Sequence, residues 1–228
     1  MKISPTLTEV KEIAKTGKYD ILPVSCEILS DFITPIEAMR ILQNVSTHCY
    51  LLESAQANEA WGRYTFLGYD PKLEINCIDG HMKLGKLSVE TENPSEYIRQ
   101  ILSEYKSPKF DYLPSFTGGL VGYFSYDYLG YKEKSIRGKA RDTEDFKDVD
   151  LMLFDKVIAF DNLCQKIILI ANMSLDAPET GYNKAIVELK QLRELLMHGE
   201  KKQNMGGKLL GEALFQFFHR YVDSHLAF

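Results

Sequence analysis

Two long apolar runs in the second half of the chain constrain its fold more than any other feature. Residues 150–160 and 166–171 are rich in Leu, Ile, Val, Phe and Ala, and a short connection that begins with Asp161 and Asn162 joins them. Apolar runs bounded by turn-forming residues in this way predict the two antiparallel strands of a hairpin. Because residues 166–171 are apolar at almost every position, that strand is expected to be buried on both faces.

Further segments complete an alternation of strands and helices. Residues 72–78 and 81–84 flank Asp79-Gly80, a strong two-residue hairpin turn. Residues 20–29 predict a strand, and Pro23 confines that strand to an edge or an end of its sheet, where the residue is expected to line a pocket. Four segments have apolar residues at helical spacing: 6–16, 35–44, 97–105 and 178–197.

Helix-capping patterns support two of these four segments. Thr34-Pro35-Ile36-Glu37 has the spacing of a capping box with proline at the first helical position, and Asn93-Pro94-Ser95-Glu96 repeats it. Because hairpins outnumber any strand-helix-strand unit, the sequence predicts an α+β fold of two packed, mainly antiparallel sheets with covering helices.

The composition indicates a mildly acidic globular protein. The 228 residues are 45% hydrophobic, and 27 basic against 32 acidic residues give a net charge of -5, which favours neither nucleic acid nor an anionic membrane as a partner. No apolar run approaches the roughly 18 residues of a membrane span, and the first residues lack a signal sequence, so we expect a cytoplasmic location. The four cysteines have no metal-ligand spacing and are expected to be small buried side chains.

Residues 48–68 combine two apolar runs with polar side chains between them. Cys49–Leu52 predicts a buried strand that ends in Glu53 and Ser54, and a second strand is expected over 61–67 after a small polar loop. Hydrogen-bonding side chains at the mouth between two strands indicate a pocket for a small polar molecule. The alternative is a hairpin edge at which Glu53 and Ser54 face water or cap the turn.

Two segments of the chain carry a resemblance to a known family. Leu51-Leu52-Glu53-Ser54, followed by Trp61-Gly62-Arg63-Tyr64-Thr65-Phe66-Leu67-Gly68, resembles the tryptophan-sensing segment of anthranilate synthase component I. The Gly118-Gly-Leu-Val-Gly-Tyr-Phe-Ser-Tyr-Asp127 segment resembles the wider family of chorismate-utilising enzymes, including aminodeoxychorismate synthases. Its glycines do not form a phosphate-binding motif, and they predict instead a buried strand with close backbone approach.

The resemblance covers roughly Asp20–Met197 and implies a regulatory amino-terminal region. It implies that the whole enzyme converts chorismate and glutamine or ammonia to anthranilate and pyruvate, that a glutamine amidotransferase subunit is its partner, and that L-tryptophan inhibits it. An aminodeoxychorismate synthase large subunit is the alternative within the superfamily, and a stand-alone amino-acid-binding or oligomerisation module is the alternative of another class. The L-tryptophan site is expected to include Pro23, Leu52, Glu53, Ser54, Tyr64 and Phe66.

The chain is expected to divide into a tryptophan-sensing domain over 1–200 and an amphipathic tail over 201–228. The tail does not resemble the family, and its apolar stripe is expected either to pack on the domain itself or to mediate self-association or aggregation. Nothing in the chain matches the family's larger catalytic domain, to which magnesium and the catalytic residues belong. We therefore expect no cofactor, metal ligand or catalytic residue here, and no anthranilate synthesis by this chain alone.

Overall fold

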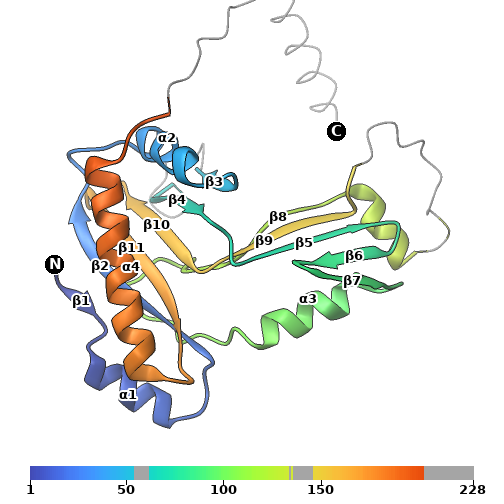
Figure 1. The fold of residues 1–228 in the computed structure, drawn as a ribbon, viewed down its shortest axis with the longest axis horizontal. Coiled ribbons are helices and arrows are strands. Elements are labelled where there is room, and N and C mark those ends of the chain that lie inside the picture. The colour runs from blue at the N-terminus through green and yellow to red at the C-terminus, as the bar shows by residue number, and fades with distance from the viewer. Residues whose placement is uncertain (54–61, 134, 136–145, 203–228) are drawn as a thin grey trace, which may run out of the picture.

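The computed structural model describes residues 1–53, 62–133, 135 and 146–202 of the chain. In these ranges the strands form two antiparallel sheets, which are flanked by four α-helices and one short 3-10 helix. Figure 1 shows helix α4 in front of the six-stranded sheet A, and the five-stranded sheet B extending away from it above helix α3. The predicted α+β class with two mainly antiparallel sheets and covering helices is confirmed.

Sheet A contains the strands that carry the candidate site. Its strand order is β1-β2-β11-β10-β4-β3, and every pairing is antiparallel. The strands are β1 (Ile3–Ser4), β2 (Ile21–Leu29), β3 (Cys49–Leu52), β4 (Tyr64–Tyr69), β10 (Lys156–Asp161) and β11 (Lys166–Ser174). Strand β11 is buried on both faces, as predicted, because Ile167 and Leu169 face one layer while Ile168 and Ile170 face the other.

Sheet B is a smaller antiparallel sheet with the order β7-β6-β5-β9-β8. Its strands are β5 (Leu73–Ile78), β6 (His81–Leu84), β7 (Leu87–Glu90), β8 (Gly119–Phe124) and β9 (Val149–Phe154), and the 3-10 helix η1 (Tyr126–Tyr131) follows β8. The predicted hairpin turn is present, with Asp79 and Gly80 at φ 49° and 85°. Strand β7 was not predicted.

Three helices cover one face of sheet A. They are α1 (Leu7–Lys15), α2 (Pro35–Val45) and α4 (Pro178–His198), and their buried side chains form the main core with alternate residues of β2, β4, β10 and β11. Both Thr6 and Thr34 form complete capping boxes. Helix α3 (Pro94–Ser103) packs instead on sheet B, and there the side chain of Asn93 hydrogen bonds to Glu96 rather than to the helix backbone, which differs from the predicted cap.

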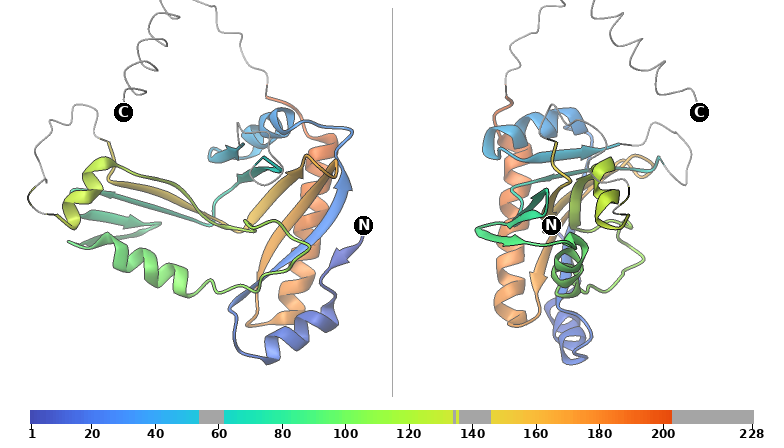
Figure 2. Two further views of the ribbon diagram at one scale, coloured as in Figure 1. Left: turned by 180° about the vertical axis from the view of Figure 1, so that it is seen from behind. Right: turned by 90° about the vertical axis from the view of Figure 1, so that its right-hand side faces the viewer.

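The opposite face of sheet A carries a second, smaller core. Val157, Ala159, Ile168 and Ile170 face Leu113, together with half-buried aromatic side chains of β4 and of the segment between α3 and β8. Figure 2, seen from behind, shows this segment crossing the helix-free face of sheet A. The candidate site lies at the β4 end of this face.

The apolar run over residues 150–160 forms two strands, which corrects the prediction of a single one. Strand β9 pairs with β5 and β8 in sheet B, whereas β10 pairs with β4 and β11 in sheet A, so the chain passes from one sheet to the other at Asp155. The hairpin itself is confirmed, since Lys156–Asp161 pairs with Lys166–Ala171. The crossing lies at the other end of β10 from Asp161, which pairs with Tyr64 of β4.

Two strands that were expected to be buried lie at sheet edges. Strand β3 is the last strand of sheet A, and of its four residues only Tyr50 is buried. Strand β8 is the last strand of sheet B, and its residues are half-buried or exposed.

The prediction that all four cysteines are buried also needs one correction. Cys26 and Cys77 are buried and Cys49 is half-buried, but Cys164 is exposed.

Some predictions concern residues outside the described ranges. These are the polar loop after Glu53, most of the loop between η1 and β9, and the tail from residue 203. In the part of the chain that is described, none of the helices combines the length and hydropathy needed to cross a membrane.

Candidate functional site

The candidate site lies where β3 ends beside the beginning of β4. Leu52, the last residue of β3, pairs with Phe66 of β4, and Glu53 follows directly. We call Leu52, Glu53, Tyr64, Thr65 and Phe66 the β3–β4 end. The apolar side chain of Leu52 is not covered, and the residue is 47% exposed. The β3–β4 end therefore presents apolar surface to whatever lies beyond the strand.

The strand period divides the β3–β4 end between the two faces of sheet A. Leu67 belongs to the helix-covered core, whereas Tyr64 and Phe66 pack on the opposite core. Because side chains alternate along a strand, Thr65 lies on the helix-covered side and Leu52 shares the open side with its partner Phe66. The predicted apolar and polar ligand contacts are thus on different sides of the strand pair.

Glu53 belongs to a small polar group that spacing alone did not identify. The Thr65 hydroxyl, whose residue is 1% exposed, donates a long hydrogen bond of 3.5 Å to Glu53 Oε1. Asn162 Nδ2 in turn donates to Thr65 Oγ1 at 3.4 Å. Thr65 lies on β4 and Asn162 follows β10 directly, so only the pairing of these two strands reveals the contact. Together they orient a carboxylate that accepts hydrogen bonds at the end of β3.

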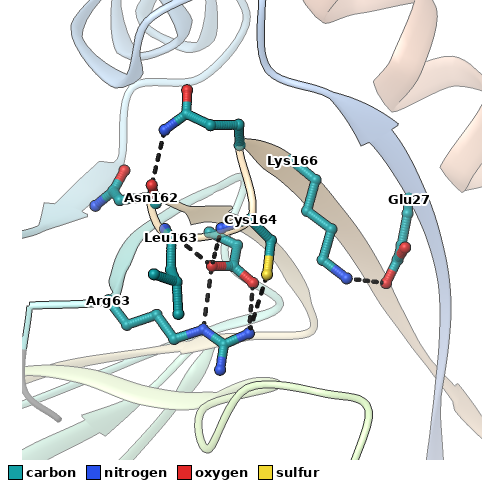
Figure 3. Close-up of polar contacts among 8 residues, drawn as sticks. Glu27, Arg63, Asn162, Leu163, Cys164 and Lys166 are labelled. Atoms are coloured by element: carbon teal, nitrogen blue, oxygen red, sulfur yellow. Dashed lines mark hydrogen bonds and ion pairs between the residues drawn. The ribbon is translucent and has the colours of Figure 1, made fainter. Parts of the chain in front are cut away.

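A charged pair fixes the same end of the sheet (Figure 3). Arg63 donates from Nε to Asp161 Oδ1 at 3.1 Å and from Nη2 to Asp161 Oδ2 at 2.8 Å, and its guanidinium lies 4.9 Å from the centre of the Tyr64 ring. The Asp161 side chain is completely buried, while that of Arg63 is 36% exposed. Paired hydrogen bonds of this kind are strong because both partners are charged.

Hydrogen bonds to Asp161 also close the turn between β10 and β11. The backbone N–H groups of Leu163 and Cys164 donate to its Oδ1 atom at 3.2 and 3.1 Å. Burial alone raises the pKa of this carboxyl, but the hydrogen bonds from Arg63 and Cys164 outweigh burial and lower the pKa to about 2. Asp161 is therefore ionised at neutral pH and holds Arg63 and the turn together.

Aromatic side chains form the open side of the β3–β4 end. The Tyr64 and Phe66 ring centres are 5.8 Å apart, and Phe66 meets Phe116 edge-on at 5.6 Å. Phe116 belongs to the segment between α3 and β8, and its place beside the site was not predicted. Flat apolar rings beside a polar group are suited to a small molecule with an aromatic part.

The structure does not bring Pro23 to this group. Pro23 lies on β2 and pairs with Asn172 of β11. Phe66 pairs with Ala159 of β10, and the β2 residue at the same level of the sheet is Glu27, four residues from Pro23. Three strand spacings, about 14 Å, separate β2 from β4. The local edge predicted for Pro23 is present, since β1 pairs only with Ser25 and Cys26 of β2. Ser54 and Trp61 lie outside the described residues.

Other polar contacts at this end of the sheet are structural. Lys166 binds Glu27 at 2.6 Å and thereby links β11 with β2, as Figure 3 shows. Gln165 Nε2 donates to the backbone carbonyl of Asn162 at 2.7 Å within the turn. Among the described residues, no group of three or more His, Cys, Asp or Glu side chains is arranged to hold a metal ion.

Comparisons with known proteins agree on one relationship. Anthranilate synthase component 1 of Acetivibrio thermocellus is 34% identical over 198 residues, which cover 84% of this chain and 39% of that protein. The Pseudomonas aeruginosa protein of the same name is 36% identical over 196 residues, covering 82% and 39%. A probable anthranilate synthase component 1 of Schizosaccharomyces pombe is 27% identical over 238 residues, covering 99% and 46%.

The structure and family comparisons add little to this relationship. A crystal structure of anthranilate synthase component I from Streptococcus pneumoniae TIGR4 is 25% identical, with a TM-score of 0.48, over 73% of this chain and 36% of that one. No family model matches the chain. The fold class therefore rests on the sheets of this chain itself.

The fold defines an α+β protein with two antiparallel sheets and an open strand end that offers a carboxylate and aromatic rings. Within that class, this chain is a relative of anthranilate synthase component I, to which it is similar over more than four fifths of its length. It spans about two fifths of the length of the first curated relatives, at 39% of each.

Proposed function

We propose that this chain is the regulatory, amino-terminal region of an anthranilate synthase component I and that it binds L-tryptophan at the β3–β4 end. The observation that carries the proposal is the pairing of an oriented carboxylate with a wall of aromatic rings at the end of β3. The Glu53 carboxylate is hydrogen bonded to Thr65 on the helix-covered side, and Tyr64 and Phe66 lie on the open side of the same strand end.

The chemistry of L-tryptophan matches these two parts. Its ammonium group requires an acceptor, which Glu53 provides directly or through water, and Ser54 next to it both donates and accepts. Its indole ring requires flat apolar surface, which Tyr64, Phe66 and the exposed Leu52 supply. The relatives named anthranilate synthase component 1 support the choice of an aromatic amino acid over other zwitterions.

The activity of the whole protein follows from the same proposal. The longer protein to which this region corresponds would convert chorismate to anthranilate and pyruvate in the cytoplasm. Ammonia would come from a glutamine amidotransferase partner. L-tryptophan bound at the β3–β4 end would act as the feedback signal of the tryptophan pathway.

A calorimetric titration tests the binding proposal. We expect L-tryptophan to bind more tightly than L-phenylalanine, and Ser54→Ala to weaken L-tryptophan binding by about 1–3 kcal/mol because a buried polar group of the ligand loses its partner. Ser103→Ala is the matched control, since its hydroxyl donates to the carbonyl of Gln100 at the end of α3, far from the site. Equal and weak responses to both amino acids in all three proteins would refute the proposal.

A further inference from the structure

A continuous series of five aromatic rings connects the β3–β4 end with the junction of the two sheets. The ring centres of Tyr64 and Phe66 are 5.8 Å apart, those of Phe66 and Phe116 5.6 Å, those of Phe116 and Tyr50 6.4 Å, and those of Tyr50 and Phe154 4.7 Å. Three of the four contacts are edge-on, with interplanar angles of 81°, 76° and 72°. This geometry is favourable for aromatic pairs.

The rings belong to elements that are distant in the sequence. Tyr64 and Phe66 are in β4 and Tyr50 is in β3, whereas Phe154 is the last residue of β9, directly before the chain crosses from sheet B to sheet A. Phe116 comes from the segment that leads into β8. It is the middle ring, so its loss interrupts the series between the site and the junction.

Tyr50 is held by packing rather than by hydrogen bonds. The residue is 9% exposed, and no described residue forms a hydrogen bond with its buried hydroxyl. Its ring lies so close to Gly68 of β4 that a Cβ atom there would be 2.2 Å from Tyr50 Cε1. Because β3 is an edge strand, the contacts of this ring with Gly68, Phe116 and Phe154 fix the position of β3 against β4.

Space for adjustment exists at the far end of the series. Phe154 lines a cavity of about 110 Å³ at the junction, and other walls of this cavity are formed by Gly118, Gly119 and Asn172. Side chains in close-packed regions move together because few voids separate them, whereas a neighbouring cavity leaves room for a ring to shift. A displacement at Phe66 can therefore be passed through Phe116 to Tyr50 and Phe154.

We propose that Phe116 is a positioning residue of the β3–β4 end, which sets the ring wall for an aromatic ligand and connects that wall with the sheet junction. The role in ligand selection rests on the function proposed above. The role in positioning β3 against β4 does not, since it follows from the ring contacts of the protein without a ligand. The competing view is that Phe116 only fills the core of sheet A.

Phe110→Leu provides a matched control for Phe116→Leu. Both residues are half-buried, both lie in the segment between α3 and β8, and both pack on the same core. The Phe110 ring, however, stacks on Tyr112 at 5.1 Å and makes none of the contacts in the series. A role limited to filling the core predicts the same behaviour for the two variants.

Hydrogen exchange of the ligand-free protein tests the positioning role. We expect the amides of β3 and β4 to exchange about tenfold faster or more in Phe116→Leu, because local opening becomes easier where packing is lost. They should remain at the wild-type rate in Phe110→Leu, and Phe116→Tyr, which keeps the ring, should restore protection. Equal exchange in the two leucine variants would overturn the proposal whether or not the protein binds L-tryptophan.

Titration of the same proteins tests the ligand role. Phe116→Leu should lower L-tryptophan affinity by about fivefold or more and reduce the preference over L-phenylalanine, while Phe110→Leu should change neither. Weaker binding with unchanged exchange of β3 and β4 would mean that Phe116 touches the ligand directly, and it would overturn the positioning role. If the wild-type protein binds neither amino acid, the proposed function fails, and the exchange experiment alone decides the role of Phe116.

Discussion

Replacing Asp161 by asparagine should make the stability of the fold less sensitive to acid. The substitution keeps an acceptor for the turn amides but removes the charge that binds Arg63 through two hydrogen bonds. The folded state lowers the pKa of Asp161 from 3.8 to about 2. At about 1.4 kcal/mol for each pH unit, this difference contributes on the order of 2 kcal/mol to the free energy of unfolding at neutral pH.

The sign of the pH dependence follows from the lowered pKa. An acid that is stronger in the folded state contributes its full stabilisation above the pKa of the unfolded chain, and loses it as the pH falls through the folded value. The contribution of Asp161 should therefore be complete above about pH 5 and should disappear between about pH 4 and pH 2. The wild-type protein and Asp161→Asn should differ most at neutral pH and converge in acid.

Urea unfolding measured by circular dichroism between pH 7 and pH 2.5 tests this reasoning. Asp31→Asn is a suitable control. Asp31 is exposed, and its substitution removes the same charge but leaves the Arg63–Asp161 ion pair intact. A variant as stable as the wild type at neutral pH would refute the argument. So would a difference in the free energy of unfolding that stays constant down to pH 2.5.

Two further predictions concern close packing and exposure. Gly68→Ala should destabilise the fold by about 1–3 kcal/mol in urea unfolding, because its Cβ would lie 2.2 Å from Tyr50 Cε1. A smaller residue at position 50 should restore much of the lost stability. If Gly68→Ala leaves the stability unchanged, the Tyr50 ring is free to move. Cys164 is exposed and should react with a thiol reagent in the native protein, whereas buried Cys26 should react only after unfolding. Equal rates for the two thiols in native conditions would contradict the burial of Cys26.

Local sequence signals predicted the helices well because their causes are local. Thr34 accepts a hydrogen bond from the backbone N–H of Glu37, three residues away, and Glu37 completes the predicted box in the same turn. Thr6 and Glu9 form a box of the same kind, which was not predicted. The Asp79-Gly80 turn is equally local, since both residues adopt the positive φ that the turn requires. Asn93 shows the limit of such signals, because its side chain donates a hydrogen bond to the Glu96 carboxylate and does not cap the helix backbone.

Strand neighbours could not be predicted in the same way. The run over residues 150–160 is interrupted only by Asp155 and Lys156, and this charged pair does not by itself show that β9 pairs in sheet B while β10 pairs in sheet A. The place of β3 and β8 at sheet edges likewise depends on which strands lie beside them. An apolar run indicates a strand, but only its partners decide how deeply it is buried.

The division of the β3–β4 end between two faces explains why residue spacing could not predict the arrangement of the candidate site. Adjacent residues of a strand point in opposite directions, so Leu52 and Glu53 cannot contact a ligand that lies on one face of sheet A. A ligand that touches both must lie beyond the last residue of β3, where none of the described strands covers either face. In the binding mode proposed above, its aromatic part would meet Phe66 and the ring series behind it, and its charged part would meet Glu53, which Thr65 holds from the helix-covered side. The motif Leu52-Glu53 suggested the chemistry of the proposed site, whereas Thr65, Asn162 and Phe116 are brought to it only by the sheet register and by the segment between α3 and β8.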